Sequence, residues 1–248
     1  MAPAAVTDPL GRNTAWSAYA AAYLFRGDFS DETGNGRTLI SGGTAPVIVS
    51  NTTENGLSGG VSNAAAAGFL SHANDPSFDG QPFEMFGIGI CPPDTGGNQI
   101  MMGMVDSTSS NTTRRLLGIR DSNQRYIYFT DEGSVDWHEG RTSIDGETVS
   151  LSFSGREGVA ERVDGFLYVD GQFADGVDAG QLSADTIQVL SGRGTSSSTD
   201  WRGICYMALF SLSAPRGDDW HRALHENFRQ ARGIFEPGQI INSVVGLQ

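Results

Sequence analysis

The richest cluster of polar and aromatic side chains in the sequence lies between residues 131 and 139. Its members are Asp131, Glu132, Asp136, Trp137, His138 and Glu139. An exposed tryptophan beside carboxylates can stack on a sugar ring while the carboxylates hydrogen-bond its hydroxyls. Two carboxylates can also cleave a glycosidic bond when one has a raised pKa and their separation is right. Among the interpretations of this cluster, we rank first an edge-strand turn with a half-buried tryptophan. A sugar or partner contact through Asp131, Asp136, Trp137 and His138 comes second, and catalysis third.

A second candidate site is the polar loop that follows the first expected strand. Asp28, Asp31 and Asn35 could offer hard oxygen ligands for calcium, with backbone carbonyls filling the other positions. The same residue types, together with the neighbouring glycines, also form turns without any metal. The turn interpretation is favoured, and calcium is the candidate cofactor.

His221 and His225 stand four residues apart, which is the helical spacing that can ligate zinc. Arg222 occupies the position where a zinc-protease helix carries its glutamate, and no third ligand is evident in the sequence. We therefore interpret them as two exposed histidines on a helix. The sequence also lacks nucleophile-elbow, phosphate-loop and zinc-knuckle motifs, so we expect a protein that is not an enzyme.

Composition limits the partners that this chain could have. The 248 residues include 29 acidic and 16 basic side chains, and the formal net charge is −13. An acidic surface repels nucleic-acid phosphates and anionic membranes, so neither is an expected partner. No segment approaches the roughly 20 apolar residues of a membrane-spanning helix. The amino terminus has no signal-peptide pattern, which predicts that the protein is made and retained in a cytoplasm or released by lysis.

Glycine is frequent at 33 residues, and turn-forming clusters recur about every ten residues, which is typical of an all-β protein. Cys91 and Cys205 each lie in an apolar, strand-like run and are expected to be buried free thiols. Strands are predicted at residues 22–25, 39–41, 47–50, 65–70, 83–91, 99–105, 116–120, 126–130, 149–153, 166–169, 186–190 and 204–210.

Two local patterns are especially clear. Tyr168 and Val169 precede Asp170-Gly171, a pair that supplies the positive φ angles of a two-residue hairpin turn. Residues 149–154 alternate between apolar side chains and serines, which predicts one buried face and one wet face.

The sequence predicts one helix near the carboxyl end. A start signal at residues 213–215 and apolar residues at helical spacing from Trp220 to Phe228 favour it, and it is expected to lie across a sheet. We divide the chain into an amino-terminal docking arm (1–19), one β domain (20–235) and an apolar tail (236–248). The predicted docking residues are Trp16, Tyr19, Ile240 and Ile241.

The order of these parts resembles the concanavalin A-like lectin and laminin-G-like superfamily. The resemblance is carried by the Gly27 to Gly36 loop, the Tyr168 to Gly171 hairpin, the strand at Arg202-Gly203-Ile204 and the late helix. It implies a jelly-roll sandwich of two antiparallel sheets with one short carboxyl-terminal helix. The stretch from Trp220 to Pro237 is similar to the end of laminin-G-like proteins of bacteriophages.

Two departures from the family pattern bear on function. Many relatives carry acidic residues in the strand after the hairpin, whereas this chain has Ile204-Cys205-Tyr206, so a calcium site of the family type is not supported. The alternating Glu-x-Asp-x-x-Glu of the glucanase relatives is also absent from the sequence.

The resemblance implies a non-enzymatic virion component, in capsid decoration or a tail fibre, with a lectin-like domain that contacts host glycans. Its partners would be other virion proteins, further copies of itself in an oligomer, or a cell-surface glycan. The alternative is a carbohydrate-binding module or a glycan hydrolase that acts on polysaccharide.

Overall fold

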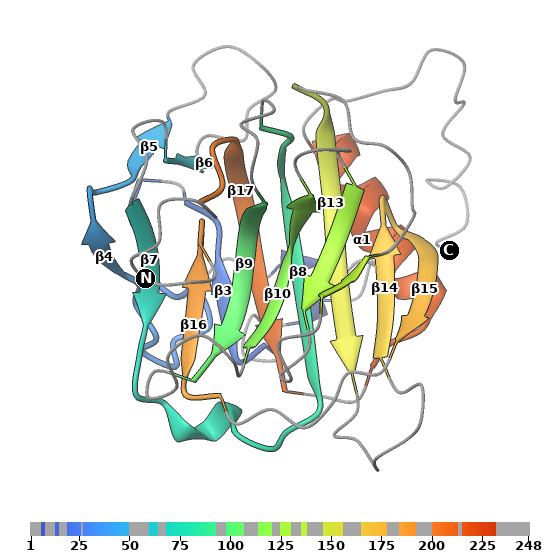
Figure 1. Cartoon of the computed structure of the whole chain (residues 1–248), viewed down its shortest axis with the longest axis horizontal. Coiled ribbons are helices and arrows are strands. Elements are labelled where there is room, and N and C mark those ends of the chain that lie inside the picture. The colour runs from blue at the N-terminus through green and yellow to red at the C-terminus, as the bar shows by residue number, and fades with distance from the viewer. Residues whose placement is uncertain are drawn as a thin grey trace.

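The chain folds as a two-sheet antiparallel β-sandwich with one helix packed outside it (Figure 1). This computed structural model describes residues 6–7, 13–14, 19–25, 27–49, 60–63, 68–92, 98–106, 114–120, 125–129, 135–137, 146–155, 165–177, 184–191, 200–212 and 215–231. The all-β sandwich with one carboxyl-terminal helix is confirmed. The boundaries at residues 19 and 235 stay predictions.

One sheet has seven strands, and every described pairing within it is antiparallel. In spatial order they are β12 (Val135–Trp137), β11 (Arg125–Phe129), β10 (Arg114–Arg120), β9 (Gln99–Val105), β16 (Thr186–Val189), β7 (Gly68–His72) and β4 (Ile40–Gly43).

The other sheet has eight strands. Seven form a path in the order β15 (Gln172–Val177), β14 (Gly165–Val169), β13 (Thr148–Gly155), β8 (Phe83–Ile90), β17 (Ile204–Ser211), β6 (Gly60–Ser62) and β5 (Val47–Val49). The eighth, β3 (Ala21–Tyr23), pairs with β17 beyond the end of β6. Outside the sandwich, β1 (Val6–Thr7) pairs with β2 (Asn13–Thr14), and the 3-10 helix η2 (Pro76–Phe78) precedes β8.

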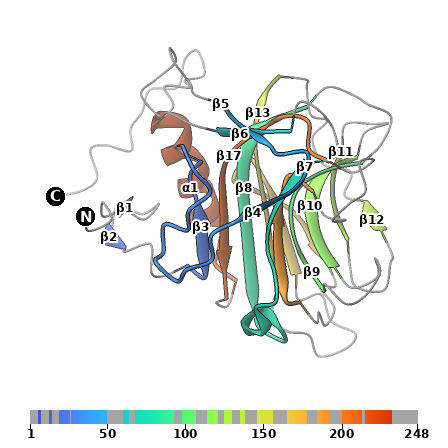
Figure 2. The same cartoon turned by 90° about the vertical axis from the view of Figure 1, so that its left-hand side faces the viewer.

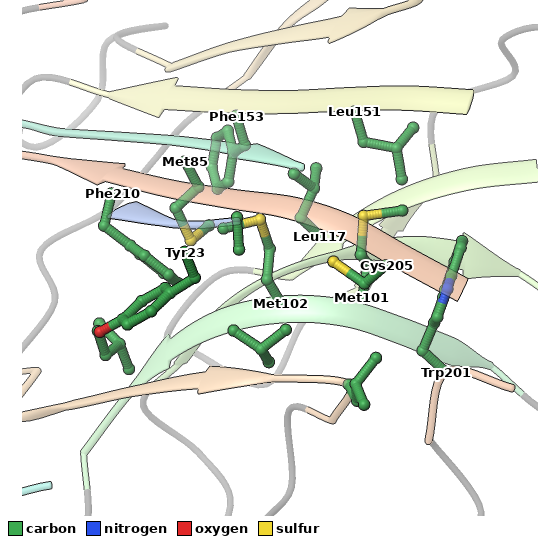
Figure 3. Close-up of a cluster of buried hydrophobic side chains, with 14 of the residues drawn as sticks. Tyr23, Met85, Met101, Met102, Leu117, Leu151, Phe153, Trp201, Cys205 and Phe210 are labelled. Atoms are coloured by element: carbon green, nitrogen blue, oxygen red, sulfur yellow. The ribbon is translucent and has the colours of Figure 1, made fainter. Parts of the chain in front are cut away.

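The space between the sheets is filled by large apolar side chains from both of them. Phe83 and Phe153 meet edge to face with ring centroids 5.0 Å apart, and Tyr23 meets Phe210 in the same way. Such pairs add stability beyond the area that they bury. Figure 3 shows the sulfur-rich part of this core, with Met85, Met101, Met102 and Cys205 among the buried side chains.

Helix α1 (Asp218–Ala231) lies on the outer face of the eight-stranded sheet, as Figure 2 shows. Because side chains alternate across a strand, β8, β13 and β17 each present a second set of residues to this helix. Under one side of the helix the contact is apolar and forms a small second core. Its buried members are Tyr19, Ala22, Phe86, Ile88, Met207, Leu209, Trp220 and Leu224.

Most sequence-based predictions of local structure are confirmed. Asp170 and Gly171 have φ angles of +50° and +74° and close a two-residue hairpin between β14 and β15. Cys91 and Cys205 are buried free thiols. No strand was predicted at β1, β2, β6 or β12, each of which has two or three residues. Within the described residues, no helix has the length and apolar character needed to cross a bilayer.

Candidate functional site

A cluster of buried titratable side chains lies between helix α1 and strands β8, β13 and β14. Two hydrogen bonds organise this helix–sheet polar layer: Ser152 Oγ to His221 Nδ1 at 2.9 Å, and Ser150 Oγ to His225 Nδ1 at 2.7 Å. Four residues advance a helix by about 6 Å, and two residues advance a strand by about 6.6 Å. Successive histidines on the helix therefore match successive serines on one face of β13.

Glu84, on β8, is the buried charge of this layer. Its Oε1 lies 3.3 Å from His221 Nε2 and accepts a hydrogen bond from the backbone N–H of Arg216, and its Oε2 lies 3.4 Å from Arg216 Nε. The Glu84 side chain is only 1% exposed, so the Arg216 guanidinium supplies the opposite charge that a buried carboxylate requires. Glu84 Oε2 and His221 Nε2 have these close neighbours but no hydrogen bond of good geometry, and the buried Oγ of Ser154 has no hydrogen-bond partner.

Aromatic rings enclose the His221 imidazole. Tyr168 stacks on it with centroids 3.7 Å apart, and Trp220 meets it at a right angle. Burial, and then the hydrogen bond that the Tyr168 hydroxyl donates to Asp218, raises the pKa of Tyr168. The phenol therefore stays protonated and keeps Asp218, at the start of the helix, attached to the sheet.

Arg216 completes the enclosure at the point where the chain enters the helix. Its guanidinium carbon lies 4.3 Å from the ring centroid of Trp220 and 5.2 Å from that of Tyr19. A planar guanidinium can stack on aromatic faces and still approach a carboxylate, which a lysine ammonium cannot do equally well. Arg216 thus contacts both the buried carboxylate of Glu84 and the aromatic rings of the small second core.

The connection from Ser152 through His221 to Glu84 has the residue types of a hydrolytic triad. All three residues are buried, with exposures of 1%, 0% and 2%, and a substrate could reach Ser152 only if helix α1 moved away. The observed geometry therefore attaches the helix to the sheet. Within the described residues, no three His, Cys, Asp or Glu side chains gather as metal ligands.

Two sequence-based predictions were wrong here. His221 and His225 are buried, not exposed, with exposures of 0% and 6%. The serine face of β13 is not wet, because Ser150, Ser152 and Ser154 are at most 1% exposed beneath the helix. Serine is small enough to lie under a helix, and a hydroxyl that finds a partner can be buried at little cost. Only the match between the four-residue histidine spacing and the two-residue serine spacing could have predicted this contact.

Two of the four predicted sugar-contact residues lie on the other, seven-stranded sheet. Asp136 and Trp137 lie on β12, the outermost strand of the seven-stranded sheet beside β11, so the predicted edge position is confirmed. Asp131 and His138 lie outside the described residues. The sugar contact itself stays a prediction.

The predicted calcium loop is held together by its own hydrogen bonds. Asp31 accepts bonds from the backbone N–H groups of Ala22, Thr33 and Arg37 and from the Thr33 hydroxyl. Asp28 accepts from the Ser30 N–H. In addition, the Asn35 side-chain amide donates to the backbone carbonyls of Tyr19 and Ala20. These hydrogen bonds are of the turn type that the sequence favoured, and calcium binding stays a prediction.

Of the four predicted docking residues, the structure describes only Tyr19. Tyr19 is 7% exposed and packs in the small core beneath helix α1, against its own domain. Trp16, Ile240 and Ile241 lie outside the described residues. Attachment of the two ends of the chain to a neighbour stays a prediction that rests on these three.

Comparisons with known proteins identify similar folds. No family model matches the chain, and no curated protein matches it. Among solved structures, Trypanosoma rangeli sialidase matches with a TM-score of 0.63 at 12% identity, over 89% of this chain and 34% of the sialidase. The botulinum neurotoxin type G receptor binding domain matches with a TM-score of 0.56 at 10% identity, over 85% of this chain and 51% of that one.

A third structure is matched over almost its whole length. It is domain 4 of a GH43 extracellular arabinanase from Geobacillus stearothermophilus, solved in complex with arabinotriose. The TM-score is 0.54 at 15% identity, and the match covers 84% of this chain and 98% of that domain. This chain thus spans about a third of the sialidase but nearly all of the arabinanase domain. At these identities, the three likenesses establish the β-sandwich fold that the chain shares with them.

Proposed function

We propose that this chain is a non-enzymatic carbohydrate-binding β-sandwich. The observation that carries the proposal is the likeness to the arabinanase domain in complex with arabinotriose, because it covers 84% of this chain and 98% of that domain. A sialidase and a neurotoxin receptor binding domain of similar fold add support. Since one fold can serve many functions, the specific residues need their own argument.

The proposed sugar contact is centred on β12. Trp137 offers an indole for stacking on a pyranose or furanose ring, and Asp136 offers a carboxylate for its hydroxyls. Asp131 and His138 flank the strand in sequence and supply further polar groups. An edge strand suits this role, because β12 pairs on only one side among the described strands.

Glycan hydrolysis would need a pair of carboxylates in an open site. Glycosidases place two carboxylates roughly 5 to 9.5 Å apart on either side of an open site. Glu84 and Asp200 are the buried carboxylates among the described residues, and Glu84 lies beneath helix α1 and pairs with Arg216, away from any open site. The alternative function, glycan hydrolysis, would show itself as release of reducing sugar by the purified protein.

The more specific proposal is that the domain serves as an adhesive component of a phage-like particle. It rests on the sequence resemblance to laminin-G-like phage proteins and on the predicted docking residues Trp16, Ile240 and Ile241. Such a component would copurify with capsid or tail proteins, and its gene would lie beside theirs. Absence of the chain from purified particles would contradict this setting and leave the carbohydrate-binding proposal intact.

The test of binding uses arabino-oligosaccharides and sialylated glycans as probes. We expect Trp137→Ala to abolish binding of whichever probe the wild-type chain retains. Phe173→Ala is the matched control, because Phe173 is 51% exposed on β15 of the other sheet. Equal binding by wild type and Trp137→Ala would exclude the proposed site. No binding to any glycan on an array would exclude the function.

A further inference from the structure

The loop after β3 contains an asparagine followed by a glycine, Asn35-Gly36. Both residues are exposed, and Gly36 has a φ of +80° with no atom within 4 Å of a Cβ built on it. Among the described residues, none accepts a hydrogen bond from the Gly36 N–H. Asparagine is a thermolabile residue, and a following glycine leaves the next backbone nitrogen without a side chain to obstruct it. The pair therefore has the open surroundings that spontaneous deamidation needs.

The side-chain amide of Asn35 holds the chain where it enters β3. Its Nδ2 donates to the backbone carbonyl of Tyr19 at 3.2 Å and to that of Ala20 at 3.0 Å. The Ala20 N–H in turn donates to the Phe210 carbonyl of β17 at 2.8 Å. Residues 19 and 20 are therefore attached to the loop through Asn35 and to the eight-stranded sheet through Phe210.

The residues that Asn35 holds belong to the packing beneath helix α1. Tyr19 is 7% exposed and lies in the small second core with Trp220. The Arg216 guanidinium carbon lies 5.2 Å from the ring centroid of Tyr19. Figure 2 shows β3, which follows this segment directly, beside the helix. A chemical change at Asn35 therefore acts on the helix contact through Tyr19.

We propose that Asn35 is a site of spontaneous deamidation, and that its conversion loosens the Tyr19–Ala20 segment from its place beneath helix α1. The Gly36 nitrogen gives up its proton and attacks Cγ of Asn35. The new N–Cγ bond closes a succinimide ring, and the Cγ–Nδ2 bond breaks as Nδ2 takes up a proton from solvent and leaves as ammonia. Water then adds to either carbonyl carbon of the ring and opens it, which gives aspartate or isoaspartate.

Either product removes the two hydrogen bonds that Asn35 donates. A carboxylate only accepts, and at this position it faces two carbonyl oxygens that also only accept. It competes, too, with the Ala20 carbonyl for Arg37, whose Nη1 donates to that carbonyl at 2.6 Å. Isoaspartate adds a methylene to the backbone of the turn that Asp31 holds through the N–H groups of Thr33 and Arg37. The segment thus loses a donor, and the turn loses its spacing.

The same two bonds also set the rate. Succinimide closure needs the Asn35 side chain to turn back on its own backbone, whereas the bonds direct it to the carbonyls of Tyr19 and Ala20. The reaction therefore proceeds from a locally opened loop. Because each such bond contributes modestly, we expect the folded chain to react about 10-fold more slowly than the urea-unfolded chain.

The first measurement is the rate of conversion in the full chain. Trypsin cleaves after Arg26 and Arg37 and releases a peptide in which Asn35 is the only asparagine, so the other Asn-Gly pair, Asn55-Gly56, does not interfere. Mass spectrometry of this peptide, after incubation of the protein at mildly alkaline pH, should show aspartate and isoaspartate accumulating with first-order kinetics. Digestion in ¹⁸O-labelled water marks any conversion that occurs during the digestion itself.

Gly36→Ala should slow the conversion by about 10-fold, because a methyl group then obstructs the attacking nitrogen. Gly34→Ala is the matched control. Gly34 has a φ of +79° and also nothing within 4 Å of a built Cβ, so it carries the same backbone strain on the other side of Asn35. Equal slowing by the two variants would overturn the proposal. A folded wild-type chain that does not convert while the unfolded chain does would overturn it as well.

The second measurement is hydrogen exchange at the Ala20 N–H, which reports whether the segment stays on β17. Asn35→Asp reproduces the aspartate product and should speed this exchange by at least about 10-fold. Thr38→Asp is the control, because it adds the same charge at a nearby exposed position that holds neither carbonyl. Wild-type exchange in Asn35→Asp, or an equal increase in Thr38→Asp, would contradict the proposed loosening.

Discussion

Gly171 lies so close to helix α1 that a Cβ atom built on it would stand 2.7 Å from the Cα of Arg222. The same residue has a φ of +74° in the turn between β14 and β15. The hairpin turn and the helix backbone therefore meet at the one residue type that can satisfy both demands. Gly171 is therefore required both by the local turn and by the packing of helix α1 against it.

Gly171→Ala should destabilise the protein by about 3 kcal/mol, the sum of left-handed backbone strain and overpacking against the helix. Urea unfolding measures the loss. Gly34→Ala is the matched control, because Gly34 has a φ of +79° and nothing within 4 Å of the added Cβ. Only the backbone cost of about 1 kcal/mol is expected there. Equal losses at the two positions would contradict the close approach of the helix.

Arg216→Met should cost about 3 kcal/mol, because it removes the cation from a buried Glu84 and leaves that carboxylate uncompensated. Adding Glu84→Gln should recover part of the loss, since the buried charge is then gone as well. A double-mutant cycle in urea gives the coupling free energy between the two residues. Strictly additive losses would show that the two side chains do not interact.

Asp75→Asn should destabilise the protein near neutral pH by about 1 kcal/mol, because the partner, Arg37, is partly exposed. Burial acts to raise the pKa of Asp75, but hydrogen bonds from Ser77 and Arg37 outweigh it and lower the pKa overall. A lowered folded-state pKa means that the contribution is present above the ordinary aspartate value near 3.9 and is lost as pH falls through the folded value.

Unfolding of wild type and Asp75→Asn across this acidic range tests the sign. The difference in their free energies of unfolding should shrink as pH falls. A difference that grows on acidification would show that the Asp75 pKa is raised in the folded protein.

Burial raises the pKa of the Cys205 thiol to about 12. The contribution of this thiol to stability is therefore present below its ordinary value and is lost as pH rises from about 9 toward 12. The native protein should react slowly with a thiol reagent, because the thiolate is the reactive form and both cysteines are buried. Counting reactive thiols before and after adding urea measures this, and fast labelling in buffer would contradict it.

The sequence predicted those features that depend on neighbouring residues. The Asp170-Gly171 turn, the strand from Phe83 and the start of helix α1 all follow from local chemistry, and the structure confirms them. Alternation along residues 149–154 correctly predicted a strand with two different faces. Periodicity shows that two environments differ, but it cannot show that the polar one is water.

The helix–sheet polar layer depends on residues far apart in the chain. Ser152 and His221 are 69 positions apart, and neither residue alone signals the other. Glu84 lies within an apolar run that reads as buried strand, so its charge was the one local sign of a partner. The pairing of Ser152 with His221 follows from the three-dimensional arrangement of strand β13 and helix α1.

The serines of β13 and the histidines of α1 also fix where the helix sits along its own axis. Apolar contacts are non-directional and would tolerate a slide of one turn with little loss. The same slide here would bring His225 over Ser152, remove His221 from Glu84 and leave Ser150 unbonded. Because buried polar groups without partners are costly, the helix has one permitted register on the sheet. The polar layer thus sets the register of helix α1 on strand β13, which the adjoining apolar contact could not do.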